Sequence, residues 1–162
     1  AWLSIRALWA CHVASLLAGL GILLRRAALV GVGVLWLLIG IPLWFVYLAI
    51  GEPFHPTSLL THVGGFAVGC HGLRLLGMPR GLWWQALVGL WLLLGIARLT
   101  SPPELNVNLA WHVYQRSECI AGFHLATLLL LSIGSLCLFY VAERQFRRLF
   151  TPRDRPGVVE PD

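Results

Sequence analysis

The sequence has no lysine, and its few acidic residues avoid the middle of every apolar run. All 12 basic residues are arginines, against seven acidic residues, and the formal net charge is +5. Glu52, Glu104, Glu118 and Glu143 stand at the ends of apolar runs. Ion pumps and proton-coupled transporters usually place a carboxylate inside a membrane span, so we do not expect transport by this chain alone. The arginines also lie at run ends, where they set topology, so the positive charge does not predict nucleic-acid binding.

The common sequence motifs of catalysis are missing as well. The chain contains no Walker loop, no GxSxG elbow, no HExxH pair and no Rossmann fingerprint. Its four cysteines show no CxxC spacing, and three of them lie inside apolar runs, where cysteine acts as a small hydrophobic side chain. A subunit is therefore expected more than a free-standing enzyme.

What the sequence has is apolar length. Hydrophobic residues make up 58% of the 162 residues and charged residues only 12%, with a mean hydropathy of +0.77. These values are typical of a polytopic membrane protein. Long runs of Leu, Val, Gly and Ala favour helices over a barrel, because a helix satisfies its own backbone hydrogen bonds. We predict an all-α membrane bundle of five transmembrane helices, at residues 3–24, 27–50, 57–77, 82–99 and 118–142.

Charge in the connections predicts the orientation. The turns after the first and third spans are short and basic, and the segment after the fifth span holds five arginines. The other two connections hold only Arg116 between them. The positive-inside rule then places the N-terminus outside and the C-terminus in the cytoplasm of a bacterial inner membrane. Residues 1–150 form the transmembrane domain, and residues 151–162, rich in Pro and charge, are expected to be a disordered cytoplasmic tail.

The connection before the fifth span carries a helix-start pattern. Ser101 and Glu104 bracket two prolines, which fits a capping box with prolines in the first turn. Apolar residues then recur at helical spacing, at Val107, Ala110, Trp111 and Tyr114. This pattern predicts a short amphipathic helix on the outer surface, above the bundle.

The third span combines histidine with a glycine strip. On a helix, Gly65, Gly69 and Gly72 lie on the same side as His62, whereas His71 projects from the opposite face. Gly65 and Gly69 form a small-xxx-small pattern, which lets membrane helices approach closely. The strip would equally accommodate a planar cofactor, a haem or a chlorin, with His62 as its axial ligand. The sequence leaves both explanations open.

Three histidines from three spans fall in the outer half of the membrane. At a rise of 1.5 Å per residue, His62 lies about 6–9 Å below the outer boundary, His124 about 9 Å and His12 about 13 Å. A b-type haem needs two imidazoles at matched depth from different helices, and His62 with His124 fits best, with His12 in reserve. Arg98 is available for the propionates, and a quinone is a further candidate ligand.

Two other interpretations of these histidines remain. The pair could be structural, with hydrogen bonds to hydroxyls of neighbouring helices. Alternatively, His12, His62, His124 and Glu118 could hold a Zn, Cu or Fe ion in a membrane enzyme, with Glu118 as a general base. No two histidines share HxxxH spacing, which weighs against the metal site.

We therefore expect a small membrane subunit of a respiratory or photosynthetic electron-transfer complex, which binds a tetrapyrrole and contacts other membrane or extracytoplasmic subunits. The first alternative is a cofactor-free accessory or scaffold subunit, and the second is the metal enzyme. In topology alone, five spans with an outside N-terminus and histidines in two of them resemble the cytochrome b subunits of respiratory oxidoreductases, such as the nitrate reductase gamma subunit. Span order and histidine spacing differ from that family, so the resemblance implies no residue roles.

Overall fold

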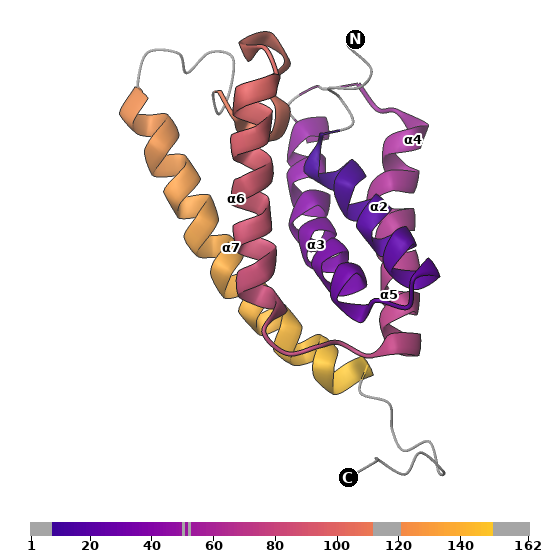
Figure 1. Ribbon diagram of the computed structural model, residues 1–162. Helices are drawn as coiled ribbons and strands as arrows, with labels where there is room; N and C mark the ends of the chain where they lie inside the picture. Colours follow the sequence, from indigo (N-terminus) through magenta and orange to yellow (C-terminus); the bar gives the residue numbers. More distant parts are fainter. Residues whose placement is uncertain (1–7, 50, 52, 112–120, 151–162) are drawn as a thin grey trace, which may run out of the picture.

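The computed structural model describes residues 8–49, 51, 53–111 and 121–150, and the regular structure in these ranges is helical. The elements, drawn in Figure 1, are α2 (Ala10–Leu23), α3 (Ala27–Ala49), α4 (Pro56–Leu59), the π-helical turn η1 (Leu60–Gly64), α5 (Gly65–Leu76), α6 (Leu82–Thr100), the 3-10 turns η2 (Pro103–Leu105) and η3 (Val107–Leu109), and α7 (Ala121–Phe150). The all-helical fold class is thus confirmed for this part of the chain. The expected tail at residues 151–162 lies outside it.

Three helices, α3, α6 and α7, are long and apolar enough to cross a membrane. The five expected spans are therefore confirmed only in part. Helix α2 has 14 described residues, which is short for a span. The expected third span is helical from Pro56 to Leu76, and the helix changes from α to π geometry at Leu60–Gly64 and back to α at Gly65. Helices α3 and α6 match their expected bounds closely, and α7 continues past the expected end at residue 142 to Phe150.

The helices form two groups that meet at α3. Helices α2, α3 and α5 pack on one another, and α6 packs on α3 from the other side (Figure 1). Helix α7 lies along α6, and its C-terminal part also reaches α5, where the Phe146 and Phe66 ring centroids are 6.4 Å apart. The largest fully buried side chains come from α3, α5, α6 and α7, and they include Val34, Leu37, Leu73, Leu82 and Phe139, while α2 buries the small residues Ala14 and Ala18.

Small residues and one indole set the spacing of these helices. Gly33 of α3 lies directly against α2, since a Cβ on Gly33 would be 2.5 Å from the carbonyl oxygen of Ala14. On the other side of α3, the Trp36 Nε1–H donates a 2.8 Å hydrogen bond to the Ala86 carbonyl oxygen of α6. A side-chain bond between helices orients them as well as bringing them together. Helix α3 is thus the central element of the fold.

The prediction of an amphipathic surface helix after Ser101 is wrong for the described residues of this segment. The segment forms the two 3-10 turns η2 and η3, and Asn106, Asn108 and Leu109 have φ angles of 40°, 57° and 60°. This left-handed conformation cannot continue an α-helix, and asparagine adopts it more readily than most residues. Val107 and Ala110 are buried, as their spacing suggested, but in an irregular loop. Tyr114 lies outside the described residues.

Candidate functional site

His62 lies in the π-helical turn between α4 and α5. A π turn widens the helix and displaces backbone carbonyls from their usual partners, and such turns are frequent at functional sites. Here side chains donate hydrogen bonds to several backbone carbonyls in and beside the π turn. The Thr61 hydroxyl donates to the Thr57 carbonyl at 3.0 Å, and the Ser15 hydroxyl of α2 lies 2.8 Å from the Thr61 carbonyl oxygen. The π turn is therefore held from both its own helix and the neighbouring one.

The ring of His62 is held in one orientation. Its Nδ1 lies 2.8 Å from the Ser58 carbonyl oxygen, and a carbonyl can only accept, so Nδ1 carries the hydrogen. The ring also stacks on Trp44 of α3, with centroids 5.1 Å apart and planes 11° from parallel. His62 is only 8% exposed. In a neutral ring with this tautomer, the lone pair belongs to Nε2, which is the arrangement that an axial or metal-binding histidine needs.

The glycine strip of α5 faces other helices. A Cβ on Gly65 would lie 2.5 Å from Ser15 Oγ, and one on Gly69 would lie 2.5 Å from Val34 Cγ2. A Cβ on Gly72 would lie 2.7 Å from Ile22 Cγ1. Side chains of α2 and α3 thus cover the whole strip. Close helix packing, one of the two explanations left open by the sequence, accounts for these glycines, and no face remains on the strip for a planar macrocycle.

Residues of α2 are the neighbours of the His62 ring near its Nε2 edge. A Cβ on Gly40 would be 3.7 Å from His62 Cδ2 and 4.0 Å from Cys11 Cβ, so Cys11 and the imidazole edge next to Nε2 border the same glycine. His12 is the next residue of the same helix, which packs on the π turn that holds His62. The reserve ligand His12 therefore belongs to a helix that contacts the His62 segment, whereas His124 bonds to the loop after α6.

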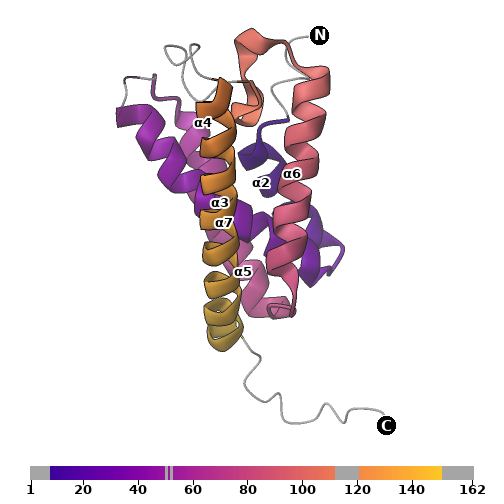
Figure 2. The same ribbon diagram turned by 90° about the vertical axis from the view of Figure 1, so that its left-hand side faces the viewer.

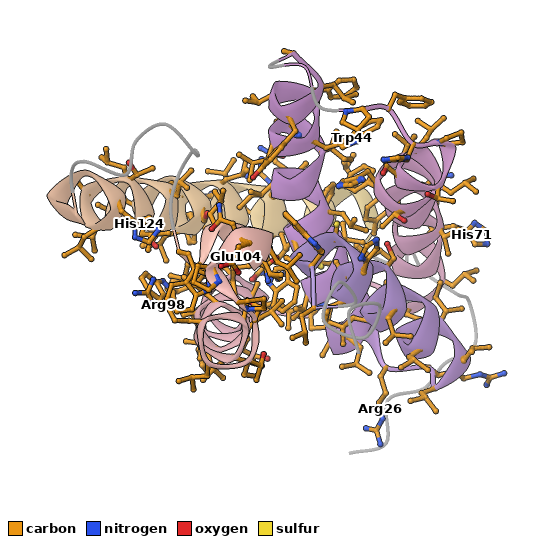
Figure 3. The ribbon with its side chains drawn as sticks, turned by 90° about the horizontal axis from the view of Figure 1, so that it is seen from above. Arg26, Trp44, His71, Arg98, Glu104 and His124 are labelled. Atoms are coloured by element: carbon orange, nitrogen blue, oxygen red, sulfur yellow. The ribbon has the colours of Figure 1, made fainter. Side chains whose placement is uncertain are left out.

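His124 and Arg98 belong to a different part of the molecule. The Nε2 of His124 donates to the Leu109 carbonyl oxygen at 3.0 Å, and Arg98 Nη1 donates to the adjacent Ala110 carbonyl at 2.6 Å. The Arg98 guanidinium also lies 4.2 Å from the Trp111 ring centroid. Figure 3 shows both residues on the α6–α7 side of the bundle, away from Trp44, on which His62 stacks.

The described part of the loop between α6 and α7 is built by hydrogen bonds that its asparagines make. Asn108 accepts from the Ala10 backbone N–H at 2.7 Å and donates to the Leu8 carbonyl at 2.8 Å, which fixes the start of α2. Asn106 accepts from the Trp111 N–H at 3.0 Å. Sequence reasoning missed both asparagines. The signal was present in the Asn-Val-Asn spacing after two prolines, because asparagine favours turns and left-handed backbone.

The candidate ligands His62 and His124 thus lie in two different parts of the described structure. Across the part of the chain that the structure describes, no three His, Cys, Asp or Glu side chains converge on a possible metal position. Glu118, the expected general base, lies outside the described residues. Comparison with protein-family models, with curated proteins and with solved structures gives no match.

Proposed function

We propose that the chain is a small integral-membrane accessory subunit, which acts by packing against a larger membrane partner. The observation that supports this is that several residues predicted to bind a cofactor make contacts within the protein itself. The glycine strip contacts α2 and α3, and Arg98 and His124 hold adjacent carbonyls of the outer loop. In the described part of the chain, these groups therefore serve packing and hydrogen bonding within the protein.

Helices α6 and α7 offer the surface for such a partner. Among the 18 most apolar consecutive residues of each helix, 22% are buried in α6 and 17% in α7, against 39% in α3. The N-terminal part of α7 diverges from α3 and α5 (Figure 1). Gly134 of α7 has no atom within 4 Å of its Cβ position, and Ile133 and Leu130 beside it are exposed. A small residue on an open membrane face allows a second helix to approach closely.

Site-specific photocrosslinking in native membranes tests this proposal. A photoreactive residue at Ile133 of α7 is expected to give one discrete protein adduct, which Gly134→Leu abolishes. The matched control is a photoreactive residue at Leu16 of α2, which is also exposed and apolar but lies on the other group of helices. Lipid adducts alone from both positions would overturn the proposal.

A second candidate function, an electron-transfer subunit that binds a haem or chlorin, is supported by the His62 tautomer. With Nδ1 donating to Ser58, the neutral ring has its lone pair on Nε2, which is the nitrogen that would bind the iron or magnesium of a tetrapyrrole. The pairing of His62 with His124 and the glycine strip do not fit a macrocycle, so His62 would act alone or with His12. A tetrapyrrole bound there would supply one-electron redox chemistry. The chain's own contribution is to fix the tautomer and to exclude water from the ring.

An absorption spectrum of the detergent-purified chain, oxidised and then reduced with dithionite, decides between the two functions. The accessory subunit is expected to be colourless, and His62→Ala should still assemble in the membrane. A Soret band that His62→Ala removes and His124→Ala leaves unchanged would establish the second candidate. Pigment bands insensitive to dithionite would indicate a chlorin instead.

A further inference from the structure

One end of the bundle carries a concentrated positive charge. The turn between α2 and α3, the loop between α5 and α6, and the C-terminal end of α7 all lie at the lower end of Figure 1, and Figure 2 shows the same arrangement from the side. Six exposed arginines lie in these three segments or in the last turn of α5. They are Arg25, Arg26, Arg74, Arg80, Arg144 and Arg148. We call them the arginine end.

In the described part of the chain, acidic side chains do little to offset this charge. Among the described acidic residues, only Glu143 lies at the arginine end, and it is 6% exposed. Its two carboxylate oxygens accept hydrogen bonds from the backbone N–H groups of Gly81 and Trp83, at 2.8 and 2.9 Å. The negative charge thus faces the N-terminus of α6. Among the described residues, this carboxylate is thus engaged by backbone N–H groups and not by the six guanidinium groups.

The position of the arginine end along the membrane normal matches that of lipid headgroups. Arg26 directly precedes α3, and Arg80 lies two residues before α6, and both helices are long enough to cross a bilayer. At 1.5 Å per residue, these side chains lie within a few ångströms of the hydrocarbon boundary. Trp84 is half exposed at the same end, and Trp83 makes an edge contact with Tyr140 of α7, as aromatic residues at a membrane interface do.

We propose that the arginine end binds the phosphate headgroups of anionic phospholipids. A guanidinium offers a planar pair of donors to phosphate oxygens, and several of them at one end of a bundle favour anionic headgroups there. A soluble polyanion is disfavoured because the groups lie at the level of the headgroups. The proposal rests on the membrane placement of α3, α6 and α7, and it is independent of the partner and cofactor proposals above.

Native mass spectrometry of the full chain in detergent tests the proposal, with phosphatidylglycerol and phosphatidylcholine of identical acyl chains as the two probes. A basic residue near an anionic membrane surface contributes about 1 kcal/mol, which corresponds to roughly fivefold in affinity. We expect phosphatidylglycerol to bind the wild type at least about fivefold more tightly than phosphatidylcholine. The double variant Arg25→Gln/Arg26→Gln should lose most of this preference.

Two further variants separate charge from structure. Arg25→Lys/Arg26→Lys keeps the charge and should keep most of the preference. Arg144→Gln/Arg148→Gln changes a different element, so a similar loss there shows that several segments share the lipid, even if one variant folds poorly. Equal affinity for the two lipids in the wild type would overturn the proposal. Displacement of phosphatidylglycerol by inorganic polyphosphate at equal phosphate concentration would also overturn it, in favour of a soluble ligand.

Discussion

Gly33→Ala is expected to destabilise the bundle by about 3 kcal/mol, the upper part of the usual range for overpacking a well-filled core. The added Cβ would lie 2.5 Å from the Ala14 carbonyl oxygen and 3.0 Å from the Ala18 backbone nitrogen. Both atoms belong to the backbone of α2, so no side-chain rotation relieves the contact. Helices α2 and α3 would have to separate, and the separation would also disturb the contacts of Gly65 and Gly69 with the same pair of helices.

Thermal unfolding in detergent, followed by far-ultraviolet circular dichroism, measures this effect. For a chain of this length, 3 kcal/mol corresponds to a fall of roughly 6–12 °C in Tm. Gly19→Ala is the matched control, because Gly19 is also in the α2–α3 pair but has nothing within 4 Å of its Cβ position. There alanine should be neutral or stabilise by up to about 1 kcal/mol through its helix propensity. A Gly33→Ala variant that melts with Gly19→Ala would contradict the close approach of α2 and α3.

The parts of the fold that could be predicted from the sequence are those fixed by composition and by run length. The apolar runs gave the bounds of α3 and α6 closely, because each run ends at a charge or a turn-forming residue. The length of α7 was underestimated, since its last part contains Glu143 and arginines that look like the end of a span. The π turn at Leu60–Gly64 has no periodicity signal, and one of its contacts, the Ser15 hydroxyl at the Thr61 carbonyl, comes from another helix.

The candidate site illustrates why depth alone is a weak predictor of contact. His62 and His124 were expected at matched depth, and depth follows from counting residues along each helix. Whether two side chains meet also depends on which helices are neighbours, and the sequence did not indicate that α7 diverges from α3 and α5. The loop between α6 and α7 was misjudged for a related reason. Val107, Ala110 and Trp111 have helical spacing, but Asn108 makes tertiary hydrogen bonds to Ala10 and Leu8 of the α2 segment.

Glu143 was expected only as a boundary residue, yet the structure gives it a structural role with a large predicted effect. Its carboxylate, from α7, accepts from the Gly81 and Trp83 N–H groups at the start of α6. Gly81 has a φ of 74°, which turns the chain into the helix and which glycine adopts without strain. These N–H groups have no partner within their own helix. The carboxylate thus replaces the usual capping side chain and joins α6 to α7 at the arginine end.

Glu143→Ala is therefore expected to lower the free energy of unfolding by about 3 kcal/mol. Two hydrogen bonds to a charged group are lost, at about 1.5–3 kcal/mol each, and partial access of water to the freed N–H groups reduces their sum. Glu143→Gln should lose less, because the amide keeps one accepting oxygen for one of the two N–H groups. Arg144→Ala, an exposed change on the same turn of α7, is the matched control and should stay within about 0.5 kcal/mol of wild type.

Thermal unfolding in detergent gives the three stabilities, and amide hydrogen exchange at Gly81 and Trp83 gives the local effect. If exchange at these two amides is equally slow in Glu143→Ala and in wild type, the carboxylate does not cap α6. Accelerated exchange confined to the first turn of α6, with the order Ala, then Gln, then wild type, is the result that the capping geometry requires.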